Sequence, residues 1–182
     1  MNRRSIWLWG LVCLLQLAAP LYLVWRWETA LDAGVAYRFQ AAPVDPFDAV
    51  RGRYVALGFA EQKGPIAAGA SLTPGEPAYA KVVADEKGFA KIAAVAPHMP
   101  AKRNGDWIRV TVVSQRNGMA FVRWPFTRYY MPEAAAPAAE EAYRRSDKKN
   151  TWAIVRVHNG DAVLETLVID GVPVKELIRE RK

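Results

Sequence analysis

Apolar residues fall into one long run near the start of the chain and many short runs after it. The long run, from Ile6 to Trp25, has 20 residues without a charge, and as a helix it measures about 30 Å, the thickness of a hydrocarbon core. The apolar region of a cleaved signal peptide is normally only about 7 to 15 residues long and ends at small residues. Here Ala18 and Ala19 are followed by Pro20, a poor residue after a cleavage site. The pattern therefore predicts a transmembrane helix that is kept as an uncleaved anchor.

Aromatic residues gather at both ends of the predicted span. Amphipathic rings are favoured in the two headgroup layers of a membrane, and the residues that we expect there are Trp7, Trp9, Tyr22, Trp25 and Trp27. We expect residues 1–27 to form the membrane anchor, with residues 6–25 inside the lipid bilayer. Residues 28–182 then form a domain outside the membrane.

Basic residues around the span predict its orientation. Arg3 and Arg4 precede the span, whereas Arg26 is soon followed by Glu28 and Asp32. The positive-inside rule then places the N-terminus in the cytoplasm. For a bacterial inner membrane, the C-terminal domain is predicted to be periplasmic or extracellular.

After residue 28 the short apolar runs alternate with polar residues at a period of two, which favours strands over helices. Three pairs of runs enclose turn-forming residues and predict hairpins, at 79–85 with 89–95, 107–115 with 119–124, and 152–157 with 162–169. The last two turns contain Asn-Gly, which tolerates the positive φ angles of a tight turn. Two further strand runs, 35–39 and 54–59, are separated by a connection rich in proline and aspartate.

One helix is predicted within this β-rich region, from about Pro137 to Arg145. It begins with proline and has acidic residues early and Arg144 and Arg145 late, as the helix dipole favours. We therefore expect a mainly β fold, in which an antiparallel, curled or barrel-like β domain with one short α-helix follows the transmembrane helix. The basic run 144–149 is interpreted as solvated surface rather than as an anion site.

The composition narrows the classes of function. The chain of 182 residues has one cysteine, Cys13, and two histidines. This excludes an intramolecular disulfide framework and a multi-thiolate metal site, so we expect no metal and no cofactor. Lysine and arginine total 25 against 18 acidic residues, and three of the arginines belong to the anchor. Because the outer domain is only mildly basic and lies outside the cytoplasm, nucleic acid is not an expected partner.

The segment 43–59 contains a short motif and a stretch before it, made up of Pro43, Asp45, Pro46, Arg51, Gly52, Tyr54, Leu57 and Phe59. With these residues the segment resembles the GDYXXLXY family, bacterial membrane-anchored proteins of unknown function. Arg53 stands where the motif has aspartate, so we carry over no acidic role, and Phe59 replaces the final tyrosine. The segments 126–133 and 160–171 are also similar to the family. The resemblance implies no particular activity, but it implies a companion of a polytopic membrane protein.

Without the family, the same segment has two interpretations. It is either a purely structural turn and strand, in which Asp45 and Asp48 accept backbone hydrogen bonds, or part of a cationic surface. Forked guanidinium donors suit a carboxylate or phosphate. The candidate residues for such an anionic-ligand or partner surface are Arg51, Arg53, Arg128 and Tyr129.

No catalytic signature accompanies the residues that could act as nucleophile or base. Ser71, Ser114, Ser146, His98 and His158 lack a nucleophile elbow or another recognised motif, so we assign no catalytic residue. The leading hypothesis is an accessory or interaction module for another integral membrane protein. The alternatives are a small envelope hydrolase and a binding module for an anionic envelope ligand.

Overall fold

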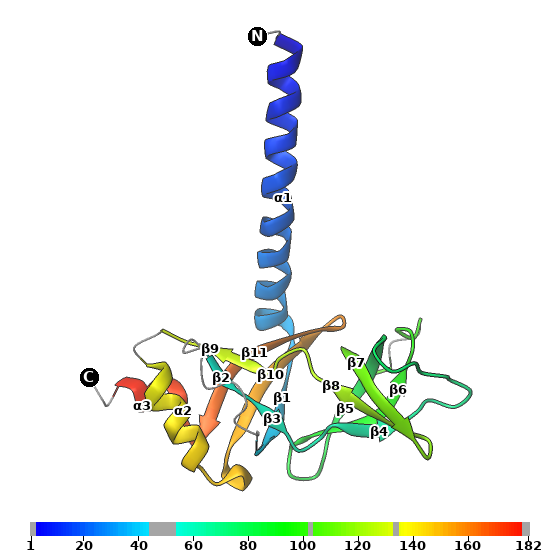
Figure 1. The fold of residues 1–182 in the computed structure, drawn as a ribbon, viewed down its shortest axis with the longest axis vertical. Helices are drawn as coiled ribbons and strands as arrows, with labels where there is room; N and C mark the ends of the chain where they lie inside the picture. The colour runs from blue at the N-terminus through cyan, green and yellow to red at the C-terminus, as the bar shows by residue number, and fades with distance from the viewer. Residues whose placement is uncertain (1–2, 44–53, 102–103, 133–134, 180–182) are drawn as a thin grey trace.

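The computed structural model of the chain describes residues 3–43, 54–101, 104–132 and 135–179, and within these ranges all side chains except those of residues 3–6, 8, 10, 11, 178 and 179. A long helix, α1 (Arg3–Ala33), stands out from a β domain (Figure 1). The predicted span 6–25 lies within this helix, so its helical part is confirmed. In the described parts of the chain, no helix offers a stretch long and apolar enough to cross a membrane. The membrane-spanning part stays a prediction.

The domain after α1 consists of twelve described strands and three short helical segments. The strands are β1 (Val35–Ala42), β2 (Tyr54–Ala56), β3 (Gly58–Phe59), β4 (Lys63–Pro65), β5 (Pro77–Ala84), β6 (Ala90–Ala96), β7 (Asp106–Arg116), β8 (Met119–Arg123), β9 (Arg128–Tyr130), β10 (Trp152–His158), β11 (Asp161–Ile169) and β12 (Val172–Pro173). The helical segments are α2 (Ala136–Arg145), the 3-10 turn η1 (Lys148–Asn150) and α3 (Val174–Arg179).

The first sheet connects the domain to α1. Its strands lie in the order β12-β11-β10-β1-β3, and all neighbours are antiparallel. Helix α1 ends at Ala33 and β1 begins at Val35, so the helix continues directly into the interior of this sheet. The β10–β11 hairpin turns at Asn159 and Gly160, with φ angles of 51° and 94°. The Asn-Gly turn predicted there is confirmed.

The second sheet has the order β4-β8-β7-β5-β6 and curls until its two edges meet. Ile66, just after β4, forms a parallel bridge with Val95 of β6, and the backbone N–H of Ala67 donates to the Val95 carbonyl over 2.8 Å. At Gly64 an added Cβ would lie 2.2 Å from Cγ2 of Ile92, so only glycine lets β4 approach β6 this closely. The sheet is therefore a nearly closed barrel.

An aromatic cluster packs between the two sheets. Phe39 of β1 contacts Trp124 and Phe126 edge to face, with 5.0 Å between ring centres in both pairs. Phe59 of β3 packs against Phe126 at 5.3 Å. All four side chains are at most 5% exposed. Such pairs add to the free energy of area burial, and here they hold the sheets together.

The structure confirms the mainly β, antiparallel, barrel-like fold and the three predicted hairpins. The predicted helix is also confirmed as α2, with Pro137 in its first turn. The prediction of one short helix in the domain was wrong, because α3 follows β12 at the end of the described chain. Its six residues are too few for the periodic pattern that identifies a helix in sequence.

The predicted strand 54–59 is interrupted at Leu57, because its two halves pair with different strands. Strand β2 pairs with β9 in a separate two-stranded sheet, whereas β3 pairs with β1. Between them the backbone N–H of Leu57 donates to the carbonyl of Thr127 over 2.9 Å. The apolar run does form strands, but the change of pairing partner within it depends on contacts with residues distant in sequence.

Candidate binding cleft

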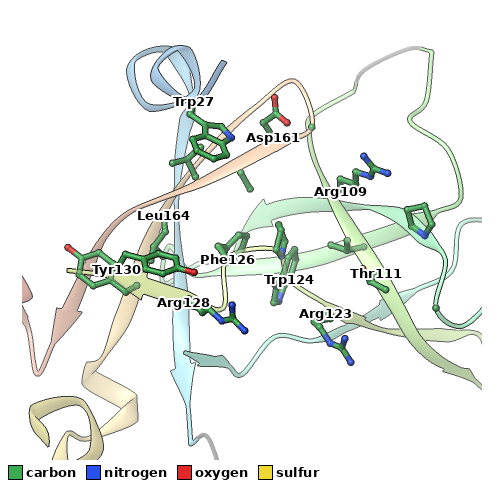
Figure 2. A pocket seen from close by; sticks show the side chains of 18 residues that line it. Trp27, Arg109, Thr111, Arg123, Trp124, Phe126, Arg128, Tyr130, Asp161 and Leu164 are labelled. Carbon is green, nitrogen blue, oxygen red and sulfur yellow. The ribbon is translucent and has the colours of Figure 1, made fainter. Parts of the chain in front are cut away.

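A cleft of about 950 Å³ lies between the two sheets, beside the end of α1 (Figure 2). Its lining combines aromatic and apolar side chains with four charged ones. The apolar and aromatic lining residues include Trp27, Trp124, Pro125, Phe126, Tyr129, Tyr130 and Leu164. The charged lining residues are Arg109, Arg123, Arg128 and Asp161. The cleft therefore offers an apolar floor with a surplus of positive charge.

The floor of the cleft is part of the packed core. Trp124 is 3% exposed, and its indole N–H donates to the carbonyl of Glu61 over 2.7 Å. Its ring stacks on Phe126 with 5.5 Å between centres and an interplanar angle of 22°. Because both rings are buried and one is held by a hydrogen bond, the floor is preorganised.

Two arginines project from the same face of the barrel. Thr111 of β7 lies opposite Arg123 of β8, and Arg109 precedes Thr111 by two residues on the same strand. Side chains alternate along a strand, so Arg109, Thr111 and Arg123 share one face, with the arginines in diagonal positions. Both arginines are exposed, and neither forms an ion pair or a side-chain hydrogen bond within the described residues. In the described part of the chain, no acidic side chain contacts either guanidinium.

Arg128 reaches the cleft from β9, on the other side of the aromatic floor. Its guanidinium carbon lies 4.9 Å from the ring centre of Tyr54, a cation–π contact across the β2–β9 pair. The Tyr54 ring in turn packs edge to face on Tyr130 at 5.8 Å. This stacking holds the Arg128 side chain against the β2–β9 pair, beside the cleft (Figure 2).

The C-terminal end of α1 forms one edge of the cleft. Trp27 lines the cleft and is 51% exposed. The neighbouring Arg26 forms a bidentate pair with Asp161, in which Nε lies 3.0 Å from Oδ2. This hydrogen bond and the negative charge of Asp161 raise the pKa of Arg26. The only acidic side chain that lines the cleft within the described residues therefore already has a cationic partner.

Further contacts fix α1 against the first sheet. Ala30 is fully buried, and the backbone N–H of Gly34 donates to its carbonyl over 3.1 Å. Arg156 of β10 donates to the Gly34 carbonyl over 3.2 Å and pairs through Nε with Glu165 at 2.6 Å. The helix and the cleft are thus parts of one packed unit.

The residues predicted as a cationic surface are only partly described. Arg51 and Arg53 lie outside the described residues, as do the motif residues Asp45, Pro46 and Gly52. Arg128 and Tyr129 both line the cleft, but their side chains differ in exposure. Arg128 is exposed, whereas Tyr129 is 8% exposed and burial raises the pKa of its hydroxyl. Tyr129 therefore serves packing more than surface recognition.

The other described motif residues are structural. Pro43 is exposed directly after β1, and Tyr54 is half-buried in the β2–β9 pair. Leu57 and Phe59 are 5% and 3% exposed. For Tyr54, Leu57 and Phe59 the geometry supports the strand of the structural interpretation, whereas the turn with Asp45 and Asp48 lies outside the described residues.

Sequence reasoning missed Arg109, Arg123 and the aromatic floor. An arginine at an outward position of a strand looks like ordinary solvated charge, and a buried aromatic looks like ordinary core. The signal that was available is the Arg-Trp-Pro-Phe stretch at 123–126, where β8 ends next to two large rings.

A serine and a lysine lie close together at the end of α2, but as a helix cap. Lys148 Nζ lies 2.9 Å from Ser146 Oγ, and burial lowers the pKa of Lys148. The Ser146 hydroxyl donates to the Tyr143 carbonyl over 2.8 Å, and Lys148 also donates to this carbonyl. Both polar groups therefore satisfy carbonyls at the helix C-terminus. Within the described residues no cluster of three or more histidine, cysteine, aspartate or glutamate side chains could hold a metal ion.

Comparison with known proteins identifies one family. The model of the family described as GDYXXLXY protein matches residues 16–167, which include the end of α1 and nearly all of the β domain. No curated protein and no solved structure matches the chain.

Proposed function

We propose that this chain, which belongs to the GDYXXLXY family, is anchored in a membrane by α1 and carries its β domain outward as an accessory module for another integral membrane protein. In a bacterium the membrane is the inner membrane, the N-terminus is cytoplasmic and the domain is periplasmic. The observation that supports the membrane anchor is the apolar surface of α1.

Large apolar side chains of α1 are exposed on all sides. The described ones are Trp7, Trp9, Val12, Leu14, Leu15, Leu17, Leu21, Tyr22, Leu23, Val24, Trp25, Trp27 and Leu31. Five of them are consecutive, from residue 21 to 25, and at 100° per residue they encircle the helix. A helix that is apolar all round needs an apolar surrounding, and the β domain meets α1 only at its end (Figure 1). A lipid bilayer supplies that surrounding.

The accessory role is supported by the docking of α1 and by the chemistry of the domain. A single span fixed to the first sheet by Arg26, Ala30 and Gly34 presents the domain at a defined position beside the membrane. The serine–lysine pair, where a hydrolase would most readily find its nucleophile, is used as a helix cap. We therefore favour recognition of a partner over hydrolysis.

Membrane anchoring is tested by extraction. The full chain should remain in the membrane pellet after sodium carbonate washing and should be released by detergent. A variant with glutamine at Leu14, Leu17, Leu21 and Val24 should appear in the carbonate supernatant. Release of the wild-type chain by carbonate would contradict the anchor.

The accessory role is tested by crosslinking in native membranes, with identification of the captured protein. Exchanging residues 6–25 for an unrelated span of equal length should preserve capture, because specificity comes from the outer domain. Reversing Arg51, Arg53 and Arg128 to glutamate should weaken capture at least several-fold. The matched control reverses three exposed basic residues elsewhere, Lys63, Lys87 and Arg116. If the exchanged span abolishes capture and the reversal of Arg51, Arg53 and Arg128 leaves capture unchanged, recognition lies within the bilayer.

A second function, the binding of an anionic ligand, is favoured by one specific observation. Arg109 and Arg123 line the cleft with no contact acid among the residues that the structure describes, and Arg128 lines the same cleft.

A further inference from the structure

The geometry points to the cleft as a binding site for the phosphate headgroup of an anionic phospholipid from the outer leaflet of the membrane. This inference rests on the proposed anchor, since it requires α1 to hold the cleft at the membrane surface. It adds a ligand class to that proposal and does not depend on which membrane protein is the partner.

The position of Trp27 brings the cleft to the headgroup layer. Trp27 lines the cleft, and it follows the predicted end of the span, Trp25, by two residues. Two residues of helix advance only about 3 Å, so the cleft begins where an indole ring favours the membrane interface. The edge of the cleft at Trp27 is therefore open to a headgroup of the same leaflet.

The charges of the cleft suit a phosphate. Arg109 and Arg123 start from diagonal positions on one face of the barrel, and Figure 2 shows their guanidinium groups pointing apart, so each lines the cleft at a separate point and offers its own forked donors to phosphate oxygens. Arginine is well suited to phosphate because its planar donors match the oxygen geometry. Asp161 is paired with Arg26, so its negative charge does not cancel theirs. Figure 2 shows Asp161 near the end of α1 and Arg123 on the opposite side of the aromatic floor.

The apolar floor distinguishes a lipid from a free anion. Phe126 and Leu164 line the same cleft as the arginines, next to the end of an apolar helix. Inorganic phosphate gains no binding free energy from contact with an apolar surface. The glycerol backbone and the first methylene groups of acyl chains gain it by burying apolar area there. An acidic peptide would also meet the arginines, but it has no reason to enter at the level of Trp27. A phospholipid fits both halves of the lining.

The test uses the full chain reconstituted in nanodiscs of phosphatidylcholine with a minor share of phosphatidylglycerol. After gentle detergent extraction, native mass spectrometry measures the ratio of the two lipids that remain bound. We expect phosphatidylglycerol to be enriched on the wild type. In the double variant Arg109→Gln with Arg123→Gln, the enrichment should fall about tenfold. This fold-change corresponds to about 1.4 kcal/mol of binding free energy. The control Lys87→Gln with Arg116→Gln removes the same charge from exposed positions outside the cleft and should keep it.

A second variant tests the apolar floor. Leu164→Ser should lower the retention of phosphatidylglycerol while the arginines remain, and addition of inorganic phosphate should fail to displace the lipid from the wild type. Displacement by phosphate would identify a free-anion site and overturn the lipid inference. Equal loss in the cleft and control double variants would reduce the effect to net charge and would also overturn it.

The two proposals fail in different ways. If carbonate releases the wild-type chain from membranes, the anchor fails and the lipid inference fails with it. If the chain stays in the membrane but shows no preference for phosphatidylglycerol, only the lipid inference is overturned. If the double arginine variant loses a captured protein while the bound lipid is unchanged, the cleft recognises protein and not lipid.

Discussion

Leu57 occupies the point where the motif segment changes from one sheet to another. Its side chain is 5% exposed, and its backbone N–H is bonded to Thr127. It belongs to the same buried cluster as Phe59 and Phe126. A buried leucine at such a junction supports both the pairing of β2 and that of β3. The conformation of the motif therefore depends on a side chain that never reaches solvent.

Truncating Leu57 should destabilise the protein strongly. For Leu57→Ala we expect a loss of about 2 to 5 kcal/mol in the free energy of unfolding, because the site loses buried methyl groups and keeps a cavity. Thermal or chemical denaturation of the detergent-solubilised chain measures it. The matched control is Val113→Ala on β7, where the side chain is 47% exposed and a change within about 0.5 kcal/mol is expected. Equal effects at both positions would remove Leu57 from the core.

Tyr37 connects the two sheets through one hydrogen bond. Its hydroxyl donates to a carboxylate oxygen of Asp106 over 2.7 Å. Burial, followed by the hydrogen bond and the charge of Asp106, raises the pKa of Tyr37. The folded state therefore favours the protonated phenol. Its contribution to stability is present below the usual tyrosine pKa of about 10 and falls as the pH rises above that value.

The variant Tyr37→Phe tests this pH dependence through the difference in stability between wild type and variant. Near pH 8 it should be less stable than the wild type by about 1 to 3 kcal/mol, since a hydrogen bond to a charged acceptor is lost. As the pH rises above about 10, the difference should shrink, because only the wild type must keep the phenol protonated. Melting temperatures of both proteins across this range provide the measurement. A difference that stays constant or grows would contradict the assigned bond.

At the scale of elements, the junction between α1 and β1 decides how the helix stands on the domain. Gly34 is the connecting residue, and an added Cβ would lie 2.2 Å from the Ala30 carbonyl oxygen and 3.1 Å from that of Val157. Neither backbone atom can move without shifting α1 or β10. The absence of a side chain at Gly34 is thus a condition for the docking of α1 and for the Arg26–Asp161 pair.

The variant Gly34→Ala should loosen α1 from the sheet. Spin labels at Leu31 on α1 and at Lys87 after β5 should give a narrow distance distribution in the wild type, because both elements belong to one packed unit. In Gly34→Ala the distribution should broaden or shift. The control is Ala33→Ser, which changes the exposed neighbouring position and should leave the distribution unchanged. An unaltered distribution in Gly34→Ala would show that the junction tolerates the clash.

At the scale of the whole molecule, we predict that the anchor is oriented so that the cleft lies on the outer side of the membrane. The prediction follows from Arg3 and Arg4 before the span and from the mixed charges after it. A reporter that is active only in the periplasm, fused after Lys182, should be active, and the purified chain should retain its first residues. Activity of a cytoplasmic reporter, or an N-terminus beyond Ala19, would reverse this topology and exclude an outer-leaflet lipid from the cleft.

Local features of the chain were predictable because their causes are local. The Asn-Gly turns at 117–118 and 159–160 adopt positive φ whatever surrounds them, and the strand runs alternate because one face is buried. Helix α2 was predicted at about 137–145 from its own terminal residues, and the α-helical run of 6–25 from its length and lack of charge. Each of these signals lies within a few residues of the element that it specifies.

Only the tertiary structure decided which elements meet. The break at Leu57, the closure of β4 on β6 and the neighbourhood of Arg109, Arg123 and Arg128 all join residues far apart in the chain. Pairing of distant strands is governed by packing of the shared core, which no single segment encodes. The sequence by itself therefore determined the three hairpins, helix α2 and the apolar helix, whereas the cleft exists because the tertiary structure brings β7, β8, β9 and β11 around one aromatic floor.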